Sequence, residues 1–372
     1  MSFARLAVSA PIVSIVLSCC APTRNMAMNA EHAEKLLYGS PDSPDVDDGE
    51  RVRFAAIGDM GMVGVPQAAV ARGVAKACND ECDFALFLGD NLYDVGIRTA
   101  ADEEDLSCLL DQYPEFPKYL TLGNHDYDKL LPKLSRAANQ LEWIQDESDV
   151  DAHGGYHFYR FSAGCVDAVA IDTNFLVRGQ LKTNYDHVAR FLGTMRPMPG
   201  RWSIAFGHHP YHSNGSHGDA GHYRDGGMSF WTGEFFRNFM DLHVLDRADL
   251  YLAGHDHNLQ FFPRIHDTDT AQVLSGSGAK CSGPVGRSEG ETTLEHYGHG
   301  FALVDAAPDR LEVTFHAYDG KKIWGTYRTR DDATWRPSKG MPRSHINRRD
   351  LCTLEKSVMM GMPNTDEMRA CM

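Results

Sequence analysis

Five short apolar segments, each ending in a polar turn that contains glycine, constrain the fold of this 372-residue chain more than any other feature. A short apolar run bounded by turn residues is typical of a strand that is buried on both faces. The segments therefore predict five buried strands. These are Val52–Ile57, Phe84–Leu88, Tyr119–Leu122, Ser203–Phe206 and Leu250–Ala253.

Stretches with helical character separate consecutive members of this set. Strands that alternate with helices predict βαβ units around a central sheet, and therefore an α/β fold. The predicted helices are Pro66–Cys78, Asp102–Leu110, Asp186–Met195 and Gly233–Asp246. A later group of β-rich segments has no long helix between its members, so we expect it to form a second sheet packed against the first. That group is Gln272–Ser275, Phe301–Val304, Arg310–Phe315 and Lys322–Thr326.

Residue types that bind metals in proteins gather just after the five strands. Loops at the carboxyl ends of the strands of an open α/β sheet converge on one crevice. Carboxylate and phenolate oxygens mixed with imidazoles suit iron, manganese or zinc and do not suit calcium. His255 and His257 form the sharpest pair, because alternation places both imidazoles on one side of an extended loop. The collected groups are Asp59, Asp90, Tyr93, Asn124, His125, His208, His255 and His257.

The order of these turns resembles that of the calcineurin-like metallophosphoesterases. The blocks are GDMG at 58–61, GDNLYDVG at 89–96, GNHD at 123–126, GHHP at 207–210 and GHDH at 254–257. Tyr93, three residues after Asp90, makes the chain similar to the purple acid phosphatases, and best to their compact, tartrate-resistant form. The resemblance extends from Val52 to Thr326. It implies a four-layer α/β/β/α sandwich of two mixed sheets flanked by helices.

The same resemblance implies a binuclear metal centre in which Asp90 bridges the two ions. In this resemblance, the Fe(III) site is formed by Asp59, Tyr93 and His257. The second site, which holds divalent Fe, Zn or Mn, is formed by Asn124, His208 and His255. Two carboxylates and a phenolate suit a trivalent hard cation, whereas an amide and imidazoles suit a divalent one.

These assignments predict an acid phosphatase that hydrolyses phosphate monoesters with a metal-bound hydroxide as nucleophile. Metal charges of about +5 outweigh about −4 from the ligands and hydroxide, so the site attracts phosphate although the protein is acidic. We expect His125 and His217 to act as proton donor and transition-state stabiliser, without assigning which is which. The alternative for His217 is that it is one of several loop histidines with no role.

Two other functions remain open at this point. A phosphodiesterase or nucleotide pyrophosphatase of the same superfamily would keep the metals, but such enzymes generally lack the Tyr93 ligand. An exported protein that binds phosphate without catalysis would be expected to have lost ligands, and every ligand position here is filled. The chain also departs from the family pattern at Met60, where Trp is usual, and at His209, where Tyr is usual. We expect His209 and the long polar loop over 209–228 to alter the substrate rim.

The charge balance bears on partners. The chain carries 36 Lys and Arg against 51 Asp and Glu, a formal net charge of −15. This excess of acid argues against nucleic acid, which selects a basic surface. We expect small phosphate esters as substrates, with phosphoproteins as a second candidate class, and a monomeric protein.

The ends of the chain differ from its centre. Arg5 followed by the apolar run Leu6–Leu17 predicts an export signal over residues 1–20. Val16–Cys19 resembles a bacterial lipobox, so the protein is expected to be periplasmic, secreted or anchored at the cell surface through a lipid on Cys19. We interpret residues 21–50 as a flexible acidic spacer, 51–328 as the catalytic domain and 329–372 as an irregular C-terminal extension.

Nine cysteines are present. Without Cys19 and Cys20 seven remain, an odd number that leaves at least one thiol unpaired or intermolecular. Their spacing does not provide the four ligands that a structural zinc site requires. Cys352 and Cys371 are candidate partners, although the connectivity of the cysteines does not follow from the sequence.

Overall fold

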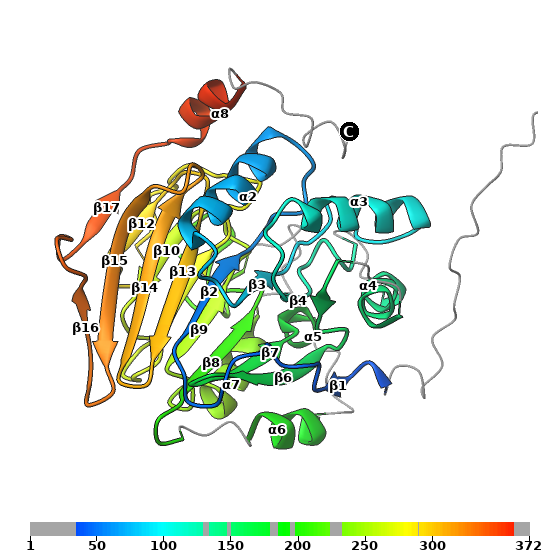
Figure 1. The fold of residues 1–372 in the computed structure, drawn as a ribbon, viewed down its shortest axis with the longest axis horizontal. Helices are drawn as coiled ribbons and strands as arrows, with labels where there is room; N and C mark the ends of the chain where they lie inside the picture. Colours follow the sequence, from blue (N-terminus) through cyan, green and yellow to red (C-terminus); the bar gives the residue numbers. More distant parts are fainter. Residues whose placement is uncertain are drawn as a thin grey trace, which may run out of the picture.

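Two mixed β-sheets pack face to face and helices cover their outer surfaces (Figure 1). The computed structural model describes residues 35–128, 134–146, 150–178, 185–193, 198–223, 233–288 and 290–360. The predicted export signal at residues 1–20 and Cys371 lie outside these ranges. No described helix is long and apolar enough to cross a membrane.

One sheet contains eight strands in the order β16-β15-β14-β13-β2-β3-β4-β5. Its first three strands in the chain, β2 to β4, run parallel, and β13 pairs antiparallel with β2. The strands are β2 Val52–Ile57, β3 Phe84–Leu88, β4 Lys118–Thr121, β5 Ala152–His153, β13 Gly300–Ala307, β14 Arg310–Ala317, β15 Lys322–Thr329 and β16 Asp332–Pro337.

The other sheet contains nine strands in the order β1-β6-β7-β8-β9-β11-β10-β12-β17. Its centre, from β7 through β8 and β9 to β11, is parallel. The strands are β1 Tyr38–Gly39, β6 Phe158–Ala163, β7 Val166–Ile171, β8 Trp202–Gly207, β9 Leu250–Ala253, β10 Leu259–Phe262, β11 Ala271–Ser275, β12 Leu294–His296 and β17 His345–Asn347.

The helices begin and end with recognisable local signals. Pro66 occupies the first turn of α2, where the missing N–H of proline is tolerated, and α3 opens with a capping box of Thr99 and Asp102. The helices are α2 Val65–Cys78, α3 Ala100–Asp111, α4 Leu134–Asp146, α5 Thr173–Val177, α6 Tyr185–Gly193, α7 Glu234–His243 and α8 Cys352–Met360.

Three separate apolar cores hold the layers together. The central core lies between the sheets and joins, for example, Phe84 of β3 to Phe206 of β8. A second core packs α5, α6 and α7 on the nine-stranded sheet, and a third packs α2 and α3 on the eight-stranded sheet. Burial of apolar surface is the main driving force for such stacking. The predicted α/β/β/α sandwich is therefore confirmed.

The predicted grouping of strands into sheets is wrong. The five motif strands do not share one sheet, because β2, β3 and β4 belong to one sheet while β8 and β9 belong to the other. The late segments are divided as well, since β11 pairs with β9 and β13 pairs with β2. Each of these strands is buried on both faces, so its sequence does not reveal its neighbours.

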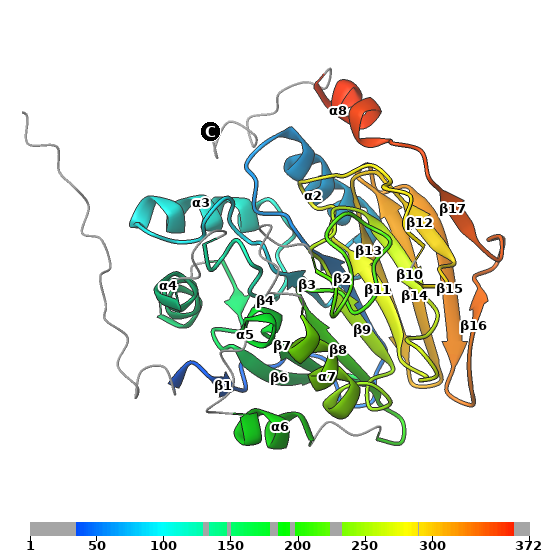
Figure 2. The ribbon, with the colours of Figure 1, turned by 180° about the vertical axis from the view of Figure 1, so that it is seen from behind.

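The two segments that flank the catalytic domain are more ordered than expected. Within the predicted spacer, Leu36 and Leu37 are buried and β1 pairs with β6. Within the predicted irregular extension, β16 pairs with β15, β17 pairs with β12, and α8 lies beside α2 (Figure 2). These expectations were wrong because short polar segments are stabilised by pairing with a sheet that is already formed.

The candidate pairing of Cys352 with Cys371 is also wrong. Cys352 is bonded to Cys281, at a Cα–Cα distance of 5.6 Å, and this bond ties α8 to the loop after β11. A second disulfide joins Cys78 to Cys82. Among the described cysteines, Cys165 is a buried free thiol. This agrees with the odd number of cysteines, which predicted at least one thiol without an intramolecular partner.

Candidate metal centre

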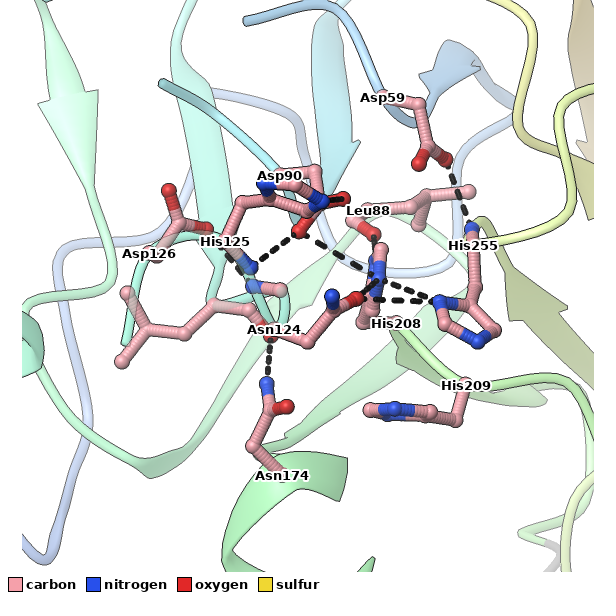
Figure 3. A network of polar contacts seen from close by, with 12 residues as sticks. Asp59, Leu88, Asp90, Asn124, His125, Asp126, Asn174, His208, His209 and His255 are labelled. Carbon is pink, nitrogen blue, oxygen red and sulfur yellow. Dashed lines mark hydrogen bonds and ion pairs between the residues drawn. The ribbon is translucent and has the colours of Figure 1, made fainter. Parts of the chain in front are cut away.

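The predicted metal ligands come together where strands from both sheets end, and Figure 3 shows Asp59, Asp90, Asn124, His208 and His255 among them. They are Asp59 after β2, Asp90 and Tyr93 after β3, Asn124 after β4, His208 after β8, and His255 and His257 after β9. Strand ends from both sheets thus meet in one site, although the sequence suggested a single sheet.

The turns that carry the ligands are conformationally strained. The φ angles of Asp59, Asp90 and His255 are 59°, 53° and 72°. A non-glycine residue in this left-handed region costs about 1–3 kcal/mol and persists only where its surroundings fix it. Gly123 is required for close approach, because a Cβ there would lie 2.1 Å from the backbone nitrogen of Asp90. Strain at three ligand positions indicates turns shaped for a site.

One half of the site is rich in oxygen atoms. The hydroxyl of Tyr93 donates to Oδ1 of Asp59 at 2.9 Å and lies 3.5 Å from Nε2 of His257. His257 Nε2 is also 3.5 Å from Asp59 Oδ1. The other carboxylate oxygen of Asp59 accepts the backbone N–H of His255 at 2.7 Å. Three side chains from three loops therefore converge on one point.

The other half is formed by Asn124, His208 and His255. Asn124 Oδ1 lies 2.9 Å from His208 Nε2 and 3.1 Å from His255 Nδ1, and the two ring nitrogens are 3.1 Å apart. His208 Nδ1 donates to the carbonyl of Leu88 at 2.9 Å, so its Nε2 carries the lone pair. Ligands at right angles and about 2.1 Å from a metal are about 3.0 Å apart. The spacing of the three atoms matches this value.

Asp90 lies between the two halves. Its Oδ1 accepts the backbone N–H of His125 at 2.9 Å and is 3.5 Å from His208 Nε2. One ligand atom from each of Asp59, Asp90 and His208 falls within a mutual distance of 4.8 Å. This position is the one that a bridging carboxylate requires.

The electrostatics of the site favour cations. Burial alone would raise the pKa of Asp90, but the charges of His208 and His125 lower it overall. Burial alone would lower the pKa of His208, but Asp90 and Asp59 raise it overall. The negative field that raises the pKa of His208 also attracts a metal ion. Among the described residues, no Arg or Lys forms an ion pair with Asp59 or Asp90.

The donor set therefore fits two metal ions. Asp59 and Asp90 are at most 1% exposed, and buried carboxylates without a Lys or Arg partner are costly unless they bind metal. Burial, followed by Asp59 and Asp90, raises the pKa of Tyr93 well above its usual range. A strongly charged cation is thus needed to displace its proton. These residues could hold Fe(III) on the Tyr93 side and a divalent ion on the Asn124 side.

The two histidines expected to contact substrate both lie beside the ligands. The ring of His125 packs 4.4 Å from that of Tyr93, and its Nδ1 donates to the carbonyl of Asp94 at 2.7 Å. Its Nε2 is 4.0 Å from Asp90 Oδ2. The ring of His217 is half-buried, and its centre lies 4.6 Å from the centre of the His255 ring and 5.5 Å from that of the His257 ring.

The buried carboxylate of Asp126, which was not among the predicted site residues, connects two of the ligand loops. It accepts backbone N–H groups from Gly123 at 2.7 Å, from Asn91 at 3.1 Å and from Leu92 at 3.2 Å. Burial, together with the nearby charge of Asp90, raises the pKa of Asp126 to about 7. The position of Asp126 at the end of the GNHD block is the sequence feature that could have identified it. Asp126 fixes the loops that carry Asp90 and Asn124.

A second such carboxylate, Asp256, holds the loop that contains His217. It is fully buried, accepts the backbone N–H of His217 at 2.9 Å and accepts the hydroxyl of Ser213. Asp256 was not among the predicted site residues, although it lies between the predicted ligands His255 and His257.

The expectation that His209 alters the substrate rim is wrong. Its side chain is only 1% exposed, and its ring packs 4.5 Å from that of His255. Its Nδ1 lies 2.8 Å from the hydroxyl of Thr173. His209 therefore packs against the metal ligand His255. The surrounding polar loop is described only up to Tyr223.

Comparison with known proteins agrees with this geometry. A family model described as calcineurin-like phosphoesterase matches residues 52–259, more than half of the chain. The chain belongs to this family. The match covers all five motif turns, so the resemblance inferred from them is confirmed.

Curated relatives of this phosphoesterase include purple acid phosphatases. Purple acid phosphatase 3 of Arabidopsis thaliana is 27% identical over 315 residues, which cover 76% of this chain and 79% of the relative. Tartrate-resistant acid phosphatase type 5 of Mus musculus is 24% identical over 331 residues, covering 78% and 92% of the two chains. These relatives support a hydrolase.

Among solved structures, the fold is similar to that of GAP50, the anchor in the inner membrane complex of Plasmodium. The TM-score is 0.59 at 18% identity, over 84% of this chain and 95% of that one. The structure of PhoD gives a TM-score of 0.55 at 11% identity, over 90% and 78% of the two chains. At these identities the likeness shows the fold alone.

Proposed function

We propose that this phosphoesterase is an acid phosphatase that hydrolyses phosphate monoesters at a binuclear centre of Fe(III) and a divalent Fe, Zn or Mn ion. The observation that carries the proposal is the position of Tyr93, whose hydroxyl lies 2.9 Å from Asp59 and 3.5 Å from His257. A phenolate beside a carboxylate and an imidazole is a donor set for a hard trivalent ion. The purple acid phosphatases among the relatives support the same reading.

The metal ions would supply Lewis acidity and an activated water molecule. Asp90, between the two donor sets, would hold the ions at a fixed separation. Asp59, Tyr93 and His257 would bind one ion. Asn124, His208 and His255 would bind the other. The buried carboxylates of Asp126 and Asp256 keep the loops in place, so that the site is organised before substrate binds.

His125 and His217 would act on the substrate itself. The Nδ1 of His125 is committed to the Asp94 carbonyl, which leaves its Nε2 directed toward the centre. Protonated at Nε2, His125 would donate a hydrogen bond to the phosphoryl group as negative charge develops. His217 stands next to both histidines of the GHDH turn and would donate a proton to the departing oxygen.

Two features support the setting in which we propose that the enzyme works. The disulfides Cys78–Cys82 and Cys281–Cys352 are typical of an oxidising compartment, which supports export. The net charge of −15 supports small phosphate esters or phosphoproteins, and not nucleic acids, as substrates. We propose a monomer whose attachment to a membrane, if any, is through a lipid on Cys19.

A comparison of monoester with diester hydrolysis tests this function. Purified protein should turn over p-nitrophenyl phosphate far faster than bis(p-nitrophenyl) phosphate, with loss of activity on prolonged chelation and recovery on addition of iron and zinc. A preference for the diester would favour the phosphodiesterase alternative. Absence of turnover with both metals bound would favour the phosphate-binding alternative.

A further inference from the structure

The loop that follows β11 forms one wall of the metal centre. The backbone N–H groups of Gly278 and Ala279 donate to the carbonyls of Gly58 and Asp59, each at 3.0 Å. A few residues later, the N–H of Ser282 donates to the carbonyl of His257 at 2.9 Å. This loop, residues 276–283, is thus hydrogen-bonded to two of the three turns that supply ligands to the Tyr93 side, those of Asp59 and His257.

The same loop places a lysine on the face of the tyrosine ring. Lys280 Nζ is 3.3 Å from the centre of the Tyr93 ring and 3.9 Å from Oδ1 of Asp94. The lysine side chain is 21% exposed, whereas that of Asp94 is 75% exposed. The ammonium group is therefore held mainly against the ring, and its pairing with the solvated carboxylate is weak.

A disulfide restrains the loop at the adjacent residue. Cys281 is bonded to Cys352, the first residue of α8. On the far side of this bond, Ser282 Oγ lies 3.3 Å from His257 Nδ1. The backbone is thus restrained on both sides of Lys280, by the Ala279 hydrogen bond before it and by the disulfide after it. Because this backbone is already fixed, only the side chain of Lys280 loses conformational entropy when its ammonium group is held against the ring.

We propose that Lys280 is a positioning residue that sets the donor strength of the Tyr93 phenolate toward its metal ion. The proposal rests on the proposed function, because it requires Tyr93 to bind iron. An ammonium group over the face of an aromatic ring is attracted by the ring electrons, and more strongly when the ring carries negative charge. Lys280 withdraws electron density from the phenolate, so the ion that Tyr93 binds stays more electron-poor.

The proposal predicts the direction of change of two quantities, the wavelength of the visible band and the midpoint potential of the iron. The visible band of a phenolate bound to Fe(III) moves an electron from the ring to the iron, and a cation beside the ring makes that transfer harder. Loss of the Lys280 charge should therefore shift the band to longer wavelength. Removal of a positive charge near the centre also stabilises Fe(III) relative to Fe(II), so the midpoint potential should fall.

The experiment compares Lys280→Met, Lys280→Arg and a matched surface control, Lys339→Met, all as full-length iron-loaded protein. Lys280→Met should retain the wild-type metal content, show the band at longer wavelength and have a lower midpoint potential. Lys280→Arg should stay close to wild type, because a guanidinium also stacks on an aromatic face. Lys339 is exposed, so its variant should match wild type in every measurement.

The outcomes separate this inference from the function on which it rests. A wild-type band that is unchanged in Lys280→Met overturns the role of Lys280 and leaves the phosphatase proposal intact. Equal shifts in the Met and Arg variants, or loss of metal from Lys280→Met, show that the side chain acts through packing and also overturn it. Absence of any visible band in iron-loaded wild type overturns the assignment of Tyr93 to iron.

Discussion

Three buried histidines should make the fold sensitive to acid. Burial is the main cause that lowers the pKa of His212, His296 and His316, each to about 4 from an ordinary value of 6.5. His316 illustrates why, since its ring faces the Gly320 carbonyl and the Thr314 hydroxyl, which together satisfy a neutral imidazole. Between pH 6.5 and 4 the unfolded chain binds protons that the folded chain does not.

The direction and size of the change in stability with pH follow from this difference in proton binding. The stabilisation is fully present above pH 6.5 and is lost as the pH falls toward 4, because protons then favour the unfolded state. At pH 5 each histidine contributes a slope of about 1.2 kcal/mol per pH unit, so the three together contribute about 3.6 kcal/mol per pH unit. From pH 7 to pH 5 the loss reaches about 5 kcal/mol, which is comparable to the whole stability of many domains.

Urea unfolding of wild type and His316→Gln, measured at intervals between pH 4.5 and 7.5, tests the reasoning. Glutamine keeps a hydrogen-bonding side chain but does not titrate, so the slope of unfolding free energy against pH near pH 5 should fall by about 1.2 kcal/mol per pH unit. His187→Gln, on the exposed face of α6, is the control and should leave the slope unchanged. Equal slopes in wild type and His316→Gln would refute the account of a buried neutral histidine.

Three further changes test the site and its support. Asp90→Ala should lose both metal ions and all hydrolysis, because its carboxylate lies between the two donor sets; elemental analysis that finds both ions would contradict this. His217→Asn should lower kcat for an alkyl phosphate about 100-fold and for p-nitrophenyl phosphate much less, because p-nitrophenolate leaves without a proton. Equal losses for the two substrates would remove His217 from the acid role. Cys352→Ser should lower the free energy of unfolding by about 2–4 kcal/mol in denaturant titration, and an unchanged value under non-reducing conditions would count against a structural role for the bond.

The sequence predicted the strands of the site closely and their neighbours poorly. The strands Val52–Ile57, Phe84–Leu88 and Leu250–Ala253 have the bounds that their apolar runs indicated. Such runs report burial, which is a local property, whereas sheet membership depends on partners far away in the chain. The position of β13 beside β2, about 250 residues apart, has no local signal.

The ligands were accessible to sequence reasoning because each follows a strand end directly. Asp126 and Asp256 were not selected, because a carboxylate that accepts backbone N–H groups looks in sequence like any acidic turn residue. Lys280 was missed for a different reason. Its contact with Tyr93 depends on a loop held by the Cys281–Cys352 disulfide, and the pairing of cysteines could not be read from their spacing.

The central claim is that Tyr93 binds iron in a binuclear centre, and metal analysis combined with a visible spectrum tests it most directly. Purified wild type should contain about two metal ions per chain, at least one of them iron, and should show a visible charge-transfer band that is absent from Tyr93→Phe. The variant should keep its fold, since the Tyr93 ring packs beside His125 and a phenylalanine preserves that contact. Iron-loaded wild type without the band, or a band that persists in Tyr93→Phe, would contradict the assignment.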